Sequence, residues 1–184
     1  MSTVNATTYQ HESGAGDNLI LAADGTTTIP GGTNRPKIVG YQQGSWSGVV
    51  SGATSGVVTY SAVEFKWMRI GQLVTVWFSF RSGNKATAGA VEIQNLPYQS
   101  SAMTVNFPGF IGDRGPINYG SGFNDVYTRV GYQSDYADLM QKNADNHGEF
   151  TNASLPTNCT IRGTQAYLTD DTTWQPINGA TVDP

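Results

Sequence analysis

The stretch from Leu73 to Arg81 constrains the fold of this chain most strongly, because its side chains alternate strictly. Successive side chains of a β-strand point to opposite faces of a sheet. One face of such a strand would carry Val74, Val76, Phe78 and Phe80. Val and Phe suit a pleated, buried surface. We therefore predict a long strand here that lines a hydrophobic core.

The opposite face of this strand also carries large apolar side chains, because Leu73 and Trp77 stand there beside Thr75 and Ser79. A Trp side chain left in water exposes a large apolar area, which is unfavourable. We therefore expect a second sheet or a neighbouring subunit to cover part of this face.

Short strands and turns recur along the rest of the sequence. The chain has 184 residues with 22 Gly and 8 Pro, and apolar runs alternate with Gly, Pro and Asn at intervals of roughly 8 to 12 residues. We expect a strand at Ala102–Phe107 that Pro108-Gly109 ends, and helical or irregular structure at Asp135–Asn146. This pattern predicts an all-β fold, an antiparallel β-sandwich or jelly roll.

The N-terminal 40 residues differ in character from the rest. Residues 1–16 are polar and aperiodic, which predicts an extended arm that lies against a partner. Asp24-Gly25 predicts a hairpin between two short strands, Leu19–Ala22 and Thr26–Ile29. A Pro- and Gly-rich linker follows, so we predict an attachment arm with a hairpin at 1–40 and a sandwich domain at 41–184.

An isolated hairpin is marginally stable in water, so this one needs a covering surface. Its apolar residues therefore join those of the central strands in one predicted subunit interface. That interface comprises Leu73, Trp77, Trp67, Leu19, Leu21 and Ile29.

Composition argues against several classes of function. Charged residues make up 13% of the chain and the net charge is −4, so no basic patch is available for nucleic acid. No apolar run reaches the length of a membrane span, and we expect no membrane insertion. The lone Cys159 sits in a strand pattern and is predicted to be a buried, inert thiol.

Few residues suggest catalysis or metal binding. The two histidines, His11 and His147, lack a partner at the spacing of metal ligands. A calcium site at Asp135, Asp138 and Asp145 and a pair of hydrolytic carboxylates drawn from Glu92, Asp113, Asp125 and Asp135 are the alternatives that remain open. We expect a non-enzymatic protein without cofactor, catalytic residues or metal ligands.

Aromatic residues crowd one region that is also rich in Gly, Asn and Asp. They are Tyr119, Phe123, Tyr127, Tyr132 and Tyr136. Aromatic faces among neutral polar groups suit carbohydrate binding, because sugars stack and hydrogen-bond. Packing in a core or an interface is the alternative, so these five are candidate contacts for a host glycan.

Two segments resemble β-sandwich domains of tailed-phage virion proteins. Residues 67–76 read WMRIGQLVTV and residues 91–98 read VEIQNLPY, which is similar to a signature of tail fibres, spikes and capsid decoration (cement) proteins. Residues 1–29 resemble the N-terminal segment of phage fibre-like proteins. The resemblance implies a virion protein, assembled in the host cytoplasm, that forms a homotrimer; it carries no catalytic residues.

Two positions in the virion compete on this basis. A trimeric decoration protein would stabilise the head shell and hold the major capsid protein through its arm. A tail fibre or receptor-binding tip would attach to a tail protein and recognise host glycan. Because the chain is short for a fibre, the sequence favours decoration, with the receptor-binding role as the alternative and a glycan hydrolase as a minor one.

Overall fold

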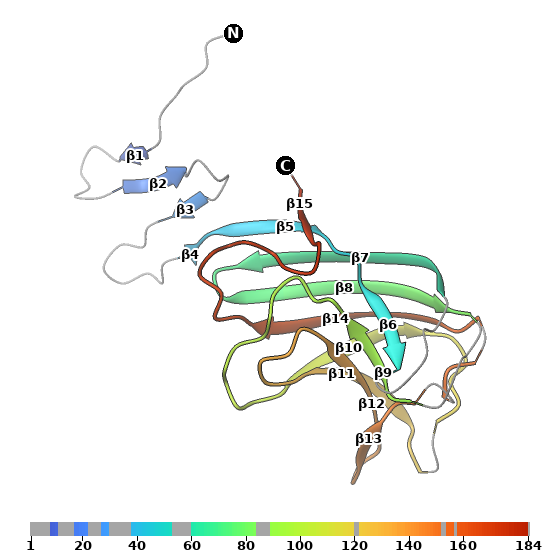
Figure 1. Ribbon diagram of the computed structural model, residues 1–184. Coiled ribbons are helices and arrows are strands. Elements are labelled where there is room, and N and C mark those ends of the chain that lie inside the picture. Colours follow the sequence, from blue (N-terminus) through green and yellow to red (C-terminus); the bar gives the residue numbers. More distant parts are fainter. Residues whose placement is uncertain are drawn as a thin grey trace.

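The computed structural model describes residues 8–10, 17–21, 27–29, 38–52, 60–83, 89–119, 122–151, 154–156 and 158–183. These residues form antiparallel strands in two sheets, one of four strands and one of eleven (Figure 1). The predicted all-β fold is confirmed. Among the described residues, no helix is long and apolar enough to cross a membrane.

The first sheet has the strand order β1-β2-β3-β4. Its strands are β1 (Thr8–Gln10), β2 (Asp17–Leu21), β3 (Thr27–Ile29) and β4 (Ile38–Val39). β2 and β3 pair antiparallel, with Ile20 opposite Thr28, so the predicted hairpin is confirmed. β1 pairs with β2, so part of the predicted arm is a strand of this sheet.

The second sheet contains the remaining strands. They are β5 (Tyr41–Ser45), β6 (Val49–Gly52), β7 (Tyr60–Ile70), β8 (Leu73–Ser82), β9 (Val91–Gln94), β10 (Phe107–Arg114), β11 (Asp125–Val130), β12 (Ala137–Lys142), β13 (His147–Glu149), β14 (Thr160–Leu168) and β15 (Thr181–Val182). Their order is β15-β5-β7-β8-β14-β10-β11-β12-β9-β6, with β13 paired to β12.

This sheet curls into a two-layered sandwich because β10 belongs to both layers (Figure 1). Residues 107–109 pair with β11, whereas residues 110–114 pair with β14. The register shifts between Ile111 and Asp113, where the strand bends. We call β15, β5, β7, β8 and β14 the β8 layer, and β11, β12, β13, β9 and β6 the β11 layer.

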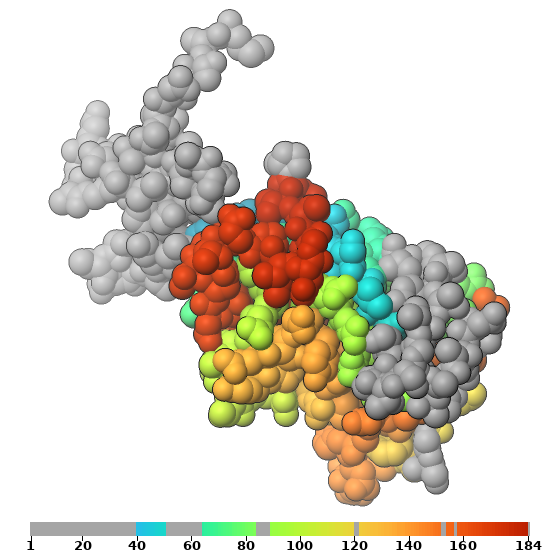
Figure 2. Space-filling model, in the orientation of Figure 1, coloured from blue at the N-terminus to red at the C-terminus, as the bar shows by residue number. Residues whose placement is uncertain are grey.

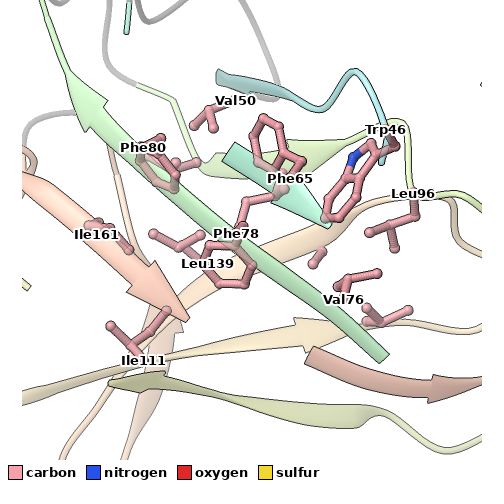
Figure 3. Close-up of a cluster of buried hydrophobic side chains, with 14 of the residues drawn as sticks. Trp46, Val50, Phe65, Val76, Phe78, Phe80, Leu96, Ile111, Leu139 and Ile161 are labelled. Atoms are coloured by element: carbon pink, nitrogen blue, oxygen red, sulfur yellow. The ribbon is translucent and has the colours of Figure 1, made fainter. Parts of the chain in front are cut away.

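The hydrophobic core lies between these layers. The four apolar residues predicted to share the inner face of β8 are all buried, which confirms the alternation. Figure 3 shows Phe78 and Phe80 directed inward among Ile111, Leu139 and Ile161, which come from β10, β12 and β14. Cys159 is also buried, and burial raises the pKa of its thiol above the ordinary value, as an inert role requires.

Two local predictions were wrong. The segment Ala102–Phe107 is not a strand; β10 begins only at Phe107 and continues through Pro108 and Gly109. Proline is tolerated there because residues 107–109 pair on one side only, with β11.

The second wrong prediction is the helical or irregular segment at Asp135–Asn146, which contains β12. Ala137 and Leu139 face the core at the spacing of a strand, but Met140 on the opposite face is buried too. The successive apolar residues Leu139 and Met140, buried on opposite faces, break the alternation by which a strand is recognised in a sequence.

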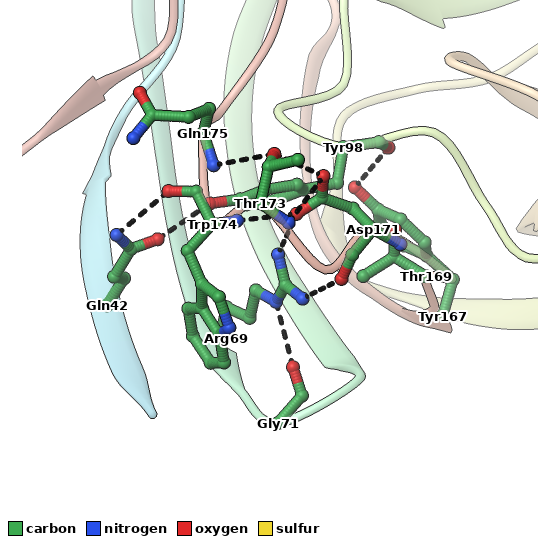
Figure 4. Close-up of polar contacts among 10 residues, drawn as sticks. All are labelled: Gln42, Arg69, Gly71, Tyr98, Tyr167, Thr169, Asp171, Thr173, Trp174 and Gln175. Atoms are coloured by element: carbon green, nitrogen blue, oxygen red, sulfur yellow. Dashed lines mark hydrogen bonds and ion pairs between the residues drawn. The ribbon is translucent and has the colours of Figure 1, made fainter. Parts of the chain in front are cut away.

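The C-terminal segment is fastened to the β8 layer through a buried arginine (Figure 4). The side chain of Arg69 is 2% exposed and lies between the rings of Tyr98 and Trp174, 4.5 and 4.0 Å from their centroids. Its Nη1 pairs with Oδ2 of Asp171 at 2.6 Å, and its Nε donates to the carbonyl of Gly71. β15 then pairs with β5, and Figure 2 shows this segment in red across the surface beside β5.

This anchor makes stability depend on pH. Burial raises the pKa of Asp171, but hydrogen bonds from Thr173, Arg69 and the backbone outweigh it and hold the pKa below the ordinary value. A carboxyl with a depressed folded pKa stabilises the fold above its unfolded pKa of about 4, and this contribution is lost as pH falls through the folded pKa. We expect unfolding titrations from pH 6 to 2 to show stability falling below about pH 4.

The variant Asp171→Asn provides the control for this dependence. Its free energy of unfolding lies below that of the wild type at pH 6, and the gap narrows as pH falls below about 4. A gap that stays constant across that range would show that Asp171 does not carry the effect.

Candidate functional site

A groove on the outer face of the β11 layer gathers aromatic and cationic side chains. It has a volume of about 490 Å³. Its lining residues are Asn106, Pro108, Gly109, Tyr127, Arg129, Lys142 and His147. We call this site the β11 groove.

The alternation of β11 explains why these side chains face outward. Val126, Thr128 and Val130 are buried against the core, so Tyr127 and Arg129 point to the outer face. Lys142 of β12 and His147 of β13 are opposite each other in register and extend the same surface. On the other side, Pro108 of β10 is opposite Arg129.

Tyr127 contacts two other residues that line the groove. Its hydroxyl lies 3.2 Å from Nδ1 of His147, and the two rings meet edge to face at 5.9 Å. Nζ of Lys142 lies 5.5 Å from the centre of the Tyr127 ring. A half-buried phenol held this way offers both an apolar surface and a polar tip to a ligand.

The two fixed cations of the groove are held by carboxylates that do not line it. Nη2 of Arg129 pairs with Oδ2 of Asp138 at 2.8 Å. Nζ of Lys142 lies 3.6 Å from Oδ2 of Asp125, whose other oxygen pairs with Arg114 at 2.7 Å. The lining of the groove itself therefore carries positive charge and no carboxylate.

The carboxylates considered for hydrolysis lie in separate parts of the structure. Each already has an ionic or hydrogen-bonding partner. Burial raises the pKa of Asp125, but hydrogen bonds from Arg114 and Val126 and nearby cations hold it below the ordinary value. A general acid needs a raised pKa, so Asp125 is unsuited to that role. Asp113 pairs with Arg162 in the β8 layer, and Glu92 accepts a hydrogen bond from Gln94.

The remaining candidate ligands lie in turns and ion pairs. Asp135 accepts a hydrogen bond from Asn178, and Asp138 is the partner of Arg129. Oδ1 of Asn143 accepts hydrogen bonds from the backbone N–H groups of Asp145 and Asn146, which makes this loop a compact turn. Within the described part of the chain, no three His, Cys, Asp or Glu side chains cluster as metal ligands.

The five aromatic residues predicted to contact glycan do not gather in one place. Only Tyr127 lines the β11 groove. Tyr119 packs against the core under Arg114, and Phe123 lies beside Gly148. Tyr132 and Tyr136 are exposed in the segment between β11 and β12.

The outer face of the β8 layer carries a row of exposed apolar side chains. The exposed residues Tyr41, Ile70 and Leu73 and the partly buried Leu168 stand opposite one another across β5, β7, β8 and β14. Trp77, 43% exposed, and Phe110, 67% exposed, stand in another row with Thr164 between them. We call Tyr41, Ile70, Leu73, Trp77 and Phe110 the apolar face.

The predicted interface residues differ in their exposure to solvent. Leu73 and Trp77 belong to the apolar face. Trp67 is 1% exposed, because it stands opposite Val76 and so faces the core; it cannot reach a partner, and its assignment to an interface was wrong. The hairpin residues Leu19, Leu21 and Ile29 lie in β2 and β3, but their side chains lie outside the described part of the structure.

Sequence reasoning missed Arg129, Lys142 and His147 as a group. A signal was present for Arg129, because the inward alternation of β11 places it outside with Tyr127. Nothing in the sequence indicated that β12 and β13 pair so as to bring Lys142 and His147 beside them.

Comparison with known proteins finds a likeness of fold. No family model matches the sequence, and no curated protein matches it. Among solved structures, the chain is similar to the Dettilon tailspike protein (gp208), with a TM-score of 0.57 and 14% sequence identity. The match covers 70% of this chain and 23% of the tailspike chain, so this chain corresponds to a minor part of that protein.

Proposed function

We propose that this chain is a bacteriophage virion structural protein of the tail, in which the sandwich presents the β11 groove to a glycan of the host surface. The observation that carries the proposal is the shared fold with a tailspike protein over 70% of the chain. A virion protein is also what the resemblance of residues 67–98 implies. This likeness concerns the fold alone, so the function has to be argued from the residues of the site.

The β11 groove supports a binding role over a catalytic one. Its lining combines the ring of Tyr127 with hydrogen-bonding side chains, which suits a sugar ring that stacks on an aromatic face and exchanges hydrogen bonds at its edges. The carboxylates that pair with the cations of the groove, Asp125 and Asp138, are fixed in ion pairs. We therefore propose recognition of the glycan without its hydrolysis.

Homotrimer formation through the apolar face completes the proposal. Several large, exposed apolar side chains on one face of a sheet are typical of a surface that another protein covers, and identical subunits are the commonest partners. The charged pair Arg162–Asp113 borders the same layer and would set the edge of the contact.

Charge substitution on the apolar face tests this assembly. We expect Leu73→Glu to convert the trimer to monomer, because three carboxylates would be buried in the contact, and Trp77→Ala to weaken assembly by about tenfold or more. Light scattering measures the mass. The control Tyr132→Ala, at a side chain 53% exposed in the segment after β11, should leave the mass unchanged.

Unchanged mass of both apolar-face variants would show that this face is not the contact. A wild-type chain that is monomeric at all concentrations would remove the trimer from the proposal.

Capsid decoration remains the second candidate. The β1–β4 sheet would serve as an attachment module for a major capsid protein as well as for a tail protein. Immunogold labelling of intact virions with an antibody against the sandwich separates the two. We expect label on the tail; label distributed over the head would contradict the tail assignment and favour decoration.

A further inference from the structure

The lining of the β11 groove contains cationic side chains and no carboxylate. Its lining includes the cations Arg129 and Lys142, the imidazole of His147 and the amide of Asn106, and it includes no carboxylate. The chain as a whole has a net charge of −4. Cations that line a pocket attract anionic ligands, even where the protein as a whole is acidic.

The cations also retain capacity for a ligand. The ammonium of Lys142 has three donors, and its distance of 3.6 Å to Asp125 is longer than a normal hydrogen bond. Asp125 already receives the guanidinium of Arg114 at 2.7 Å, so one carboxylate is shared by two cations. The guanidinium of Arg129 uses Nε and Nη2 on Asp138, and a guanidinium has five N–H donors in all.

The ring of Tyr127 adds a stacking surface beside these cations. Its ring lies close to both Lys142 and His147, so a sugar ring that stacks on it would bring its substituents near these side chains. Neutral sugars use stacking and hydrogen bonds alone, whereas an acidic substituent adds charge-assisted hydrogen bonds, which are roughly twice as strong.

We infer that the ligand of the β11 groove is an anionic saccharide, whose carboxylate or phosphate is bound by Lys142 and Arg129 while its ring stacks on Tyr127. This inference rests on the proposed function and narrows it to one class of glycan. The anion has two sources, a uronic acid within the polysaccharide or a phosphodiester between sugar units, and both present oxygen atoms to the same donors.

An array of bacterial surface polysaccharides tests the inference on the full chain. It carries neutral, uronate-containing and phosphodiester-linked polymers, and each uronate polymer is paired with its carboxyl-reduced, neutral form. We expect anionic polymers to bind at least about tenfold more tightly than their neutral counterparts, and binding to weaken with salt. The class of anionic polymer that binds more tightly, uronate or phosphodiester, identifies which anionic group the groove binds.

The variant Lys142→Gln should lose most of the preference for anionic polymers. The matched control is Arg81→Gln, which removes an exposed cation of β8, in the opposite layer, and should leave binding unchanged. Equal binding of uronate polymers and their reduced forms would overturn the inference but leave glycan recognition intact. Absence of binding to every polymer would overturn the proposed function itself.

Discussion

Replacing Arg69 with Ala is expected to lower the free energy of unfolding by about 4 kcal/mol, the range found when one partner of a buried ion pair is removed. Arg69 is 2% exposed and pairs with Asp171 at 2.6 Å. Its loss leaves that carboxylate without its cation, and it also removes the group stacked between Tyr98 and Trp174. Chemical denaturation monitored by Trp fluorescence measures the change.

Two further variants locate the source of this effect. Arg69→Lys keeps the charge but loses the planar group, so its cost should fall between those of the wild type and Arg69→Ala. Arg162→Ala removes an exposed arginine from its pair with Asp113 and should cost less than about 1 kcal/mol. Similar losses for Arg69→Ala and Arg162→Ala would show that the buried anchor contributes little to stability.

The second large effect is expected at Gly163, in the middle of β14 where β10 bends between the layers. A Cβ atom at Gly163 would lie 2.5 Å from the carbonyl oxygen of Phe110 and 2.6 Å from Cζ of Phe78. The first contact is with backbone and cannot relax by a change of rotamer. We expect Gly163→Val to destabilise the fold by about 3 kcal/mol, as overpacking of a core does.

Gly131 provides the matched control for this prediction. A Cβ atom there would lie 4.0 Å from Oδ1 of Asn106, its nearest heavy atom, so Gly131→Val should change stability by about 0.5 kcal/mol or less. Thermal unfolding of both variants checks the pair. A Gly163→Val protein as stable as the wild type would mean that the bend of β10 leaves more room than the contacts indicate.

The fold was predictable where one residue pattern decided it. The alternation along β8 identified its buried face, and Asp24-Gly25 identified the hairpin of β2 and β3. Trp67 was misplaced because its direction depends on its register with Val76, and register is a property of two strands. β12 was missed because the successive buried residues Leu139 and Met140 break its alternation.

The site was less predictable than the fold for the same reason. Tyr127 was identified from its residue type and its polar surroundings. Its partners Arg129, Lys142 and His147 come from three strands and meet only through the pairing of β11, β12 and β13. Arg69 was also missed, because charged residues are rarely buried without a partner and its partner Asp171 is 102 residues away.

Competition for phage adsorption tests the role of the β11 groove most directly. Purified wild-type chain, added to host cells before virions that carry the same protein, should block adsorption in proportion to the fraction of host glycan that it occupies. Tyr127→Ala should lose this inhibition by tenfold or more, about 1.4 kcal/mol of binding, whereas Tyr132→Ala should inhibit like the wild type. Equal inhibition by Tyr127→Ala and wild type would contradict the assignment of the groove as the glycan site.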